Sequence, residues 1–189
     1  MSVGDVVVRS YLDRSFAVHL ARALRTGLLD RHPDLTEAEG AAILWFTSDR
    51  SKELLARFHA GTVTPVDLAF VSVLEAAIEK LPYCREEYVD RVINVPTSEL
   101  PAFLAKYRVG EIIRWPAPTS CSATHAFRGR GNVIFIIRQR TGRVVGPFSW
   151  YPHENEIVIL GGHEYVVTSV DDRVASRIVV GLDEQPVEE

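Results

Sequence analysis

Two carboxylates separated by one residue stand directly before an apolar run in the C-terminal half of the chain. Glu154 and Glu156 precede Ile157 to Leu160, and in an extended strand residues two apart point to the same face, about 6.6 Å apart along the chain. Two such carboxylates can divide labour at an anomeric carbon: one stabilises a developing sugar cation, and the other deprotonates the incoming nucleophile. The alternative is a solvated strand entry without chemical function.

Hydroxyl side chains gather earlier in the chain, beside one thiol and one imidazole. They occupy Thr119, Ser120, Ser122 and Thr124, with the thiol at Cys121 and the imidazole at His125. No Gly-x-Ser-x-Gly turn surrounds the serines, which argues against a serine nucleophile. In a strand the Cys121 side chain points away from its neighbours, so we expect it to be a small buried hydrophobe. The serine hydroxyls can instead donate hydrogen bonds to a sugar or phosphate.

An arginine interrupts the apolar segment Asp90 to Asn94. Arg91 is either a solvent-facing residue of an edge strand or a planar fork directed at a phosphate or carboxylate, which arginine binds in a bidentate manner.

Metal and dinucleotide motifs of the usual kind are missing from the sequence. Cys84 and Cys121 form no Cys-x-x-Cys pair, and His125, His153 and His163 are scattered among predicted turns. No Gly-x-Gly-x-x-Gly follows a predicted strand, so a Rossmann-type nucleotide site is not expected. We therefore expect chemistry without a metal.

The elements that must position these side chains change character near Pro82. Before it the apolar period is helical, with Thr36 and Glu39 forming a predicted capping box and Thr64-Pro65 a second helix start. Gly27 is expected to end a first helix that includes Leu12 and Leu24.

After Pro82 the pattern is typical of strands. They are expected over residues 88–95, 111–115, 132–138, 156–160, 165–170 and 177–182, with a short helix over 98–106 and turns at Gly161-Gly162 and Asp171-Asp172. The 132–138 strand is expected to be buried on both faces, and the residues from Asp183 onward to form a frayed acidic tail. The chain is predicted to be one α+β domain over residues 1–189, with a helical lobe (about 1–82) and a mostly antiparallel sheet (about 83–182).

Composition restricts the possible partners. The chain has 189 residues, 47% of them hydrophobic and 24% charged, and a net charge of −4. These values exclude a disordered chain and argue against nucleic-acid binding through bulk positive charge. No apolar run reaches the roughly 20 residues of a membrane span, and no signal peptide is visible at the N-terminus.

The order of these motifs resembles the mono-ADP-ribosyltransferases of the arginine–serine–glutamate class, over about residues 40 to 170. The matching positions are Leu81-Pro82, Arg91, Tyr107 with Val109-Gly110-Glu111, Thr119 to Ser122, and Glu154 with Glu156. The sequence departs from the family pattern at Asp90 and Val92, where tyrosine and glycine are usual, and at Cys121, where threonine is usual.

The resemblance implies a split-sheet fold that binds NAD as a substrate. Arg91 would hold the NAD phosphates, and Ser120 and Ser122 would belong to the NAD-binding strand. Ser120 would orient Glu156, and Glu156 would bind the nicotinamide ribose and stabilise the cation as nicotinamide leaves.

The resemblance also implies an acceptor, which in Glu-x-Glu members is usually a protein arginine. Glu154 would activate it. Phe148, Trp150 and Tyr151, in the loop before Glu154, are candidates for exposed contacts with the target protein; the alternative for them is core packing.

Three functions remain open at this point: transfer of ADP-ribose to a protein, NAD hydrolysis, and an inactive binding module. The Arg91, Ser120 and Glu156 set argues against the third, and Glu154 favours transfer over hydrolysis. The resemblance further implies a bacterial toxin or secreted effector that acts in the cytoplasm of a target cell, with a possible immunity protein as partner.

Overall fold

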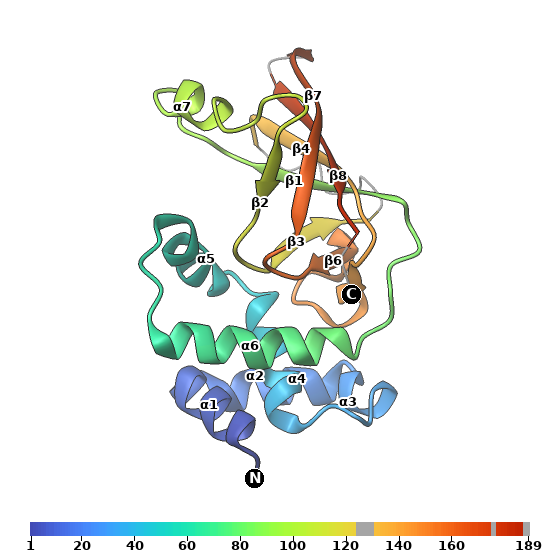
Figure 1. Ribbon diagram of the computed structural model, residues 1–189. Helices are drawn as coiled ribbons and strands as arrows, with labels where there is room; N and C mark the ends of the chain where they lie inside the picture. Colours follow the sequence, from blue (N-terminus) through green and yellow to red (C-terminus); the bar gives the residue numbers. More distant parts are fainter. Residues whose placement is uncertain (124–130, 175–176, 187–189) are drawn as a thin grey trace. The chain divides into compact units, whose positions relative to one another are not determined.

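The computed structural model describes residues 1–123, 131–174 and 177–186. The chain divides into two compact units: residues 1–83 with 143–152, and residues 84–142 with 153–189. Thr124 and His125 of the hydroxyl-rich segment lie outside the described residues. Figure 1 labels the elements of both units.

The first unit is helical. Its helices are α1 (Val3–Leu12), η1 (Asp13–Ser15), α2 (Phe16–Arg25), α3 (Leu28–Arg31), α4 (Glu37–Phe46), α5 (Ser51–Ala60) and α6 (Pro65–Glu79), and it also contains β5 (Arg143–Val144) and η2 (Gly146–Phe148).

Helix α4 forms the centre of this unit. All of its residues from Gly40 to Phe46 are buried, and it packs against α1, α2 and α6, with the long α6 crossing these helices in Figure 1. A Cβ on Gly40 would lie 2.7 Å from Leu29 Cδ2, so glycine permits the close approach of α3. A helix that is apolar on every side is a core helix of this kind.

The predicted helix starts are confirmed. Thr36 and Thr64 both close capping boxes, with Glu39 and Asp67 as the reciprocal acceptors, and Pro65 occupies the first turn of α6. The first predicted helix is interrupted: Asp13 has φ 42°, and the 3-10 turn η1 separates α1 from α2.

The segment 143–152 folds back onto the helical unit. Arg143 bridges to Tyr83 as an isolated antiparallel pair and donates from Nη1 to the Leu81 carbonyl at 2.9 Å. Trp150 Nε1 donates to the Leu44 carbonyl at 2.8 Å, so the end of this segment is fixed on α4.

The second unit contains the sheet. Its elements are β1 (Tyr88–Ile93), α7 (Leu100–Leu104), β2 (Ile112–Arg114), β3 (Thr119–Ser122), β4 (Val133–Arg138), β6 (Glu156–Ile159), β7 (Glu164–Val174) and β8 (Arg177–Glu184), and the 3-10 turn η3 (Pro152–Glu154) leads into β6.

These strands lie in the order β2-β7-β8-β4-β1-β3-β6. Among the described residues, every pair of neighbouring strands in this order is antiparallel except β4 with β8. The sequence-based prediction of an α+β fold with a mostly antiparallel sheet is therefore confirmed. In its core the Trp115 ring packs edge to face against Phe135, with ring centroids 5.2 Å apart, and tilted against Tyr165, with centroids 5.0 Å apart.

Three details of the predicted strands are wrong. Strand β4 alternates, with Val133, Phe135 and Ile137 buried and Ile136 exposed, because only one of its faces is covered. Asp171-Asp172 is not a turn, since β7 continues to Val174. The acidic end is not frayed from Asp183, because Glu184 closes β8 and is fully buried.

Among the described residues, no single helix has the length and apolar composition needed to cross a membrane; only α5 and α6 taken together, bent by 117° at their junction, meet that test.

Candidate active site

The ladder between β3 and β6 brings a hydroxyl and a carboxylate together. Ser120 lies opposite Val158 and Ser122 opposite Glu156, so the three polar side chains share one face of the two strands. Ser120 Oγ donates a hydrogen bond of 2.7 Å to Glu156 Oε1. The structure thus joins two residues that the sequence placed 36 positions apart.

Glu156 is a buried carboxylate, with 4% of its surface exposed. Burial raises its pKa to about 7, and the nearby Glu154 charge adds to the rise, while the Ser120 hydrogen bond and the Arg91 charge oppose it. A carboxylate with such a pKa is ready to interact with positive charge, because a cation beside it restores the ionised form.

Arg91 lies where β1 and β3 part. The two strands share one register pair, Asp90 opposite Ser122, and continuing the ladder would place Val92 opposite Ser120. Instead, the Arg91 guanidinium donates from Nη1 to the Ser120 carbonyl at 2.8 Å. The side chain therefore occupies the opening between the strands and is half-buried there.

Glu154 does not share a strand with Glu156, which corrects the expectation of one strand face. It belongs to η3, and Asn155 between them has φ 46°, a left-handed conformation that asparagine tolerates better than most residues. Two hydrogen bonds fix this turn to the end of β3: Ser122 Oγ to the Glu154 carbonyl at 2.8 Å, and Ala123 N to the Asn155 carbonyl at 3.1 Å.

Cys121 points away from this face. It is 5% exposed, and burial raises the pKa of its thiol to about 12, so it remains protonated and unreactive at neutral pH. The expectation of a small buried hydrophobe is confirmed.

A cavity of about 170 Å³ opens beside these residues. Arg91, Ser120, Ser122 and Glu154 line it, together with the buried Asp90. The sequence pattern predicts no role for Asp90, which only departs from a motif there. Its signal was an acidic residue in an otherwise apolar strand, next to an arginine. The cavity offers a cation, two hydroxyls and carboxylates, which suits a ligand that carries phosphates, sugar hydroxyls and a positive centre.

The three aromatic residues before Glu154 differ in exposure. Phe148 is 3% exposed and packs edge-on against His32 at 5.5 Å, so the expectation of an exposed contact is wrong for it. The reason is that η2 turns its ring into the helical unit. Trp150 is partly buried against His19, and Tyr151 is 38% exposed, with its hydroxyl donating to Asp49 Oδ2 at 3.0 Å.

No three His, Cys, Asp or Glu side chains within the described part of the chain are grouped to hold a metal ion. His153 lies in η3, and His163 Nδ1 is 2.8 Å from Glu184 Oε1.

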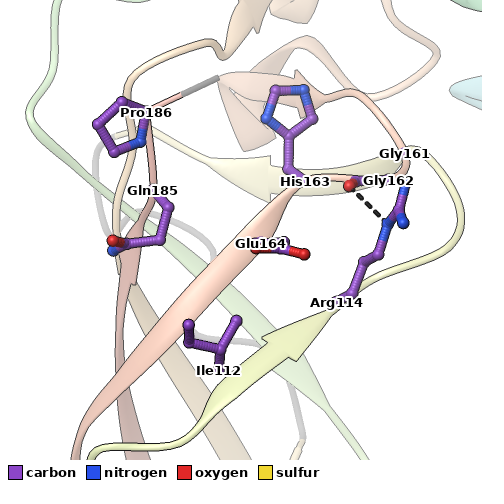
Figure 2. A pocket seen from close by; sticks show the side chains of 8 residues that line it. All are labelled: Ile112, Arg114, Gly161, Gly162, His163, Glu164, Gln185 and Pro186. Atoms are coloured by element: carbon purple, nitrogen blue, oxygen red, sulfur yellow. Dashed lines mark hydrogen bonds between the residues drawn. The ribbon is translucent and has the colours of Figure 1, made fainter. Parts of the chain in front are cut away.

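A larger hollow of about 620 Å³ lies between β2, the turn that leads into β7, and the residues that follow β8, as Figure 2 shows. Its arginine, Arg114, donates a hydrogen bond from Nε to the Gly162 carbonyl at 2.8 Å, and the described residues that line it include no hydroxyl side chain. It therefore lacks the serine hydroxyls that line the smaller cavity.

Comparison with known proteins gives one similar sequence. No protein-family model matches the chain. A protein of Mycobacterium avium (strain 104), Mav, whose name provisionally describes it as an NAD(+)–arginine ADP-ribosyltransferase, is 34% identical over 162 residues. The match covers 83% of this chain and 19% of that protein, so the chain spans about a fifth of this relative's length.

Several solved structures have the same fold. The type III effector XopAI from Xanthomonas axonopodis pv. citri superposes with a TM-score of 0.75 at 18% identity, over 94% of this chain and 80% of that one. Exoenzyme S from Pseudomonas aeruginosa, solved with human 14-3-3 protein beta and carba-NAD, gives 0.74 at 17% identity, over 100% and 92%. The ADP-ribosyltransferase HopU1 of Pseudomonas syringae pv. Tomato DC3000 gives a TM-score of 0.69 at 15% identity, over 96% of this chain and 87% of that one. The resemblance inferred from the sequence is confirmed, and so is the fold.

Proposed function

We propose that this chain, which has the ADP-ribosyltransferase fold, is an enzyme that transfers ADP-ribose from NAD to an arginine side chain of a protein and releases nicotinamide. One observation carries the proposal: Arg91 is hydrogen-bonded to the main chain of Ser120, whose side chain is hydrogen-bonded to Glu156. A phosphate-binding cation, a hydroxyl and a buried carboxylate thus form one connected set beside a cavity.

Arg91 binds the NAD phosphates. One Nη1 hydrogen bond to the Ser120 carbonyl fixes the guanidinium plane, and its other N–H groups remain for the pyrophosphate oxygens, which a planar fork binds in a bidentate manner. The departure at Val92 does not affect this contact, because it is made by the arginine side chain.

Glu156 stabilises the positive charge that develops on the ribose as nicotinamide leaves. Its burial removes competing water, so the attraction between carboxylate and cation is stronger than in solution. NAD already carries a positive nicotinamide ring, and that charge favours the ionised form of Glu156 when NAD binds. Ser120 holds the carboxylate in position with its 2.7 Å hydrogen bond.

Glu154 serves the acceptor. A guanidinium is a poor nucleophile while it is protonated, and its pKa lies above about 12, so a nearby carboxylate is needed to accept its proton. Glu154 lines the cavity, and the β3 contacts of its turn hold its main chain beside the Glu156 strand. Water needs less activation than a guanidinium, so hydrolysis alone would not require this carboxylate. The presence of Glu154 beside the cavity therefore favours transfer over simple hydrolysis.

We also propose a biological setting. The chain acts as an effector or toxin domain in the cytoplasm of another cell, and the producing cell protects itself with an immunity protein. The likeness in fold to the type III effector XopAI supports the effector part of this proposal.

The experiment is incubation of the protein with NAD labelled in its adenylate part, in the presence of a cell lysate. Label should enter protein, and nicotinamide should be released. The bond between the label and the protein should show the hydroxylamine sensitivity of an ADP-ribosyl-arginine linkage. Replacing the site carboxylate, Glu156→Gln, should abolish both labelling and nicotinamide release. The matched control is Glu164→Gln, which changes an exposed carboxylate on β7 and should leave both unchanged. Free ADP-ribose without protein label would replace transfer by hydrolysis, and no reaction at all would leave only a binding module.

A further inference from the structure

The proposed chemistry leaves one charged residue of the candidate active site without a role. Asp90 lines the cavity together with Arg91 and Glu154, and it is 6% exposed. All three residues belong to the second unit. In the family that the sequence resembles, tyrosine is usual at this position, so the family pattern gives no account of a carboxylate here.

Asp90 stands in a row with two other residues of the site. It lies opposite Ser122 of β3, and Ser122 lies opposite Glu156 of β6. Because paired residues of neighbouring strands direct their side chains to the same face, the two carboxylates lie on one face with a hydroxyl between them. At a strand spacing of about 4.8 Å, their main chains are about 9.6 Å apart.

The face of β1 that carries Asp90 is open to solvent beside it. Its other register partner, Ile136 of β4, is 36% exposed. Arg91 starts from the opposite face, where its partner Phe135 is buried, and its guanidinium reaches the opening between β1 and β3 through the hydrogen bond to the Ser120 carbonyl. Groups of opposite charge from both faces of β1 therefore meet at the cavity.

The order of these groups across the sheet corresponds to the order of the parts of NAD. Glu156 lies on β6, the Arg91 guanidinium at the opening between β3 and β1, and Asp90 on β1. In NAD the pyrophosphate lies between the nicotinamide ribose and the adenosine ribose. With the first ribose at Glu156 and the pyrophosphate at Arg91, the adenosine ribose lies beside Asp90.

We infer that Asp90 makes the enzyme specific for NAD over NADP, because its negative charge lies beside the 2′-oxygen of the adenosine ribose. This inference rests on the proposed function and adds the choice of dinucleotide to it. NAD has a hydroxyl at that oxygen, which donates a hydrogen bond to a carboxylate, whereas NADP has a phosphate, which a carboxylate repels.

The cations of the cavity support this choice. Sites that accept NADP provide an arginine for the 2′-phosphate. Among the described residues that line the cavity, Arg91 is the only cation, and the pyrophosphate occupies it. Glu154 adds a second negative charge. A third phosphate would therefore meet carboxylates without a cation of its own.

The repulsion needs no direct contact with Asp90. Its Oδ1 is enclosed, but charges interact over several ångströms, and the interaction is stronger in a cavity from which the ligand excludes water than in bulk solvent. Rejection of one of two similar ligands by a like charge is a common source of specificity.

The test compares NAD and NADP as substrates for nicotinamide release. The measured quantity is the ratio of kcat/KM for NAD to that for NADP, and we expect about 10² for the wild-type protein. Asp90→Asn keeps the size of the side chain and removes its charge, so the ratio should fall by about tenfold, mainly through better use of NADP. A wild-type ratio near one would overturn the inference.

Two further variants are controls. Asp90→Glu keeps the charge and should keep a ratio close to that of the wild type. Glu164→Gln removes an exposed carboxylate of the same unit that does not line this cavity, and it should leave the ratio unchanged. An equal fall in the Glu164 variant would assign the effect to net charge and contradict a role of Asp90.

Inhibition by fragments locates the effect. AMP and 2′,5′-ADP contain only the adenosine half of the two dinucleotides. AMP should inhibit the wild-type protein more strongly than 2′,5′-ADP, and Asp90→Asn should bring the two inhibition constants closer together. An unchanged ratio of these constants would show that Asp90 does not face the adenosine ribose.

A purely structural role of Asp90 gives a different result. Asp90→Asn would then lower the melting temperature and reduce kcat/KM for both dinucleotides by the same factor, which overturns the inference. If this variant does not fold, Asp90→Ser removes the same charge with a smaller side chain and is measured in its place. Wild-type inhibition constants that are equal for AMP and 2′,5′-ADP would overturn the inference without any variant.

Failure of this inference differs from failure of the proposed function. If the wild-type protein labels protein and releases nicotinamide equally well from NAD and NADP, the specificity inference is overturned and the transferase activity stands. If it releases nicotinamide from neither dinucleotide, the proposed function itself fails.

Discussion

Ser120 Oγ and Glu156 Oε1 are joined by a hydrogen bond of 2.7 Å across the β3–β6 ladder. This bond fixes a carboxylate whose burial raises its pKa to about 7. The main-chain carbonyl oxygen of the same serine accepts a hydrogen bond from the Arg91 guanidinium. One strand residue therefore positions both the group proposed to bind phosphates and the group proposed to stabilise the ribosyl cation.

Replacing Glu156 by glutamine should abolish both reactions of NAD. The amide keeps the size and a hydrogen bond to Ser120 but carries no charge to oppose the developing cation. We expect nicotinamide release and protein labelling to fall together by about 10²- to 10³-fold. Nicotinamide release measured beside label incorporation checks this, and near-wild-type hydrolysis by the variant would contradict the role of Glu156.

Replacing Glu154 by glutamine should separate the two reactions. If Glu154 serves only the acceptor, protein labelling is lost while nicotinamide release persists, because water needs less activation than a guanidinium. A modest change in NAD affinity is compatible with this, since Glu154 contributes to the raised pKa of Glu156. Equal loss of hydrolysis in the Glu154 and Glu156 variants would sink this division of labour.

Nicotinamide release at low NAD concentration should rise with pH through about 7. The pKa of Glu156 is raised to about that value in the free protein, chiefly by burial, and only the ionised form opposes the developing positive charge. Under these conditions the rate reports kcat/KM and hence the pKa of the free enzyme. A profile that is flat between pH 6 and 8 would exclude Glu156 as the titrating group.

The raised pKa of Glu156 can be checked independently through the pH dependence of the free energy of unfolding. Its folded pKa lies above the unfolded value near 4.5, so the folded state holds the proton more tightly. The protonated Glu156 therefore contributes roughly 3 kcal/mol to the free energy of unfolding. This contribution is fully present below the unfolded pKa and is lost as the pH rises to about 7. Glu156→Gln should remove this slope from urea unfolding measured as a function of pH.

Arg91→Lys should weaken NAD binding more than it slows chemistry. Lysine keeps the charge but loses the planar fork, so it cannot bind the pyrophosphate in a bidentate manner while it donates to the Ser120 carbonyl. We expect the KM for NAD to rise about tenfold, as for the loss of one charge-assisted hydrogen bond. An unchanged KM would mean that Arg91 serves the sheet rather than NAD.

A strong chelator should leave activity intact. NAD supplies its own leaving group, a positively charged nicotinamide, so the reaction needs no Lewis acid. No metal-binding group is found in residues 1–123, 131–174 and 177–186. Activity lost in chelator and restored by a divalent ion would show that the mechanism is incomplete.

Local signals in the sequence predicted much of the framework. The capping boxes at Thr36 and Thr64 and the proline at the start of α6 act within one helical turn, so the sequence contains everything they need. The same holds for the strands, whose side-chain types and bounding turns identify most of them. Predictions failed where burial depends on segments that pack against an element from elsewhere in the chain. Strand β4 was expected to be buried on both faces, but only one of its faces is covered.

The residues of the candidate site were likewise evident from the sequence, as an ordered set of an arginine, hydroxyls and glutamates. What the sequence could not supply is their geometry, because the contacts join residues far apart in the chain. Arg91 and Ser120 are 29 positions apart, and Ser120 and Glu156 are 36 positions apart.

Only the tertiary structure decided how the two glutamates differ. The positive φ of Asn155 places Glu154 in a turn instead of on the strand. Packing buries Glu156 and raises its pKa. Burial also decided that Phe148 belongs to a core and that His19 is enclosed without a partner. The sequence determined which chemical groups are present and in what order, whereas burial and pKa arise from the packing of distant segments, which no local pattern encodes.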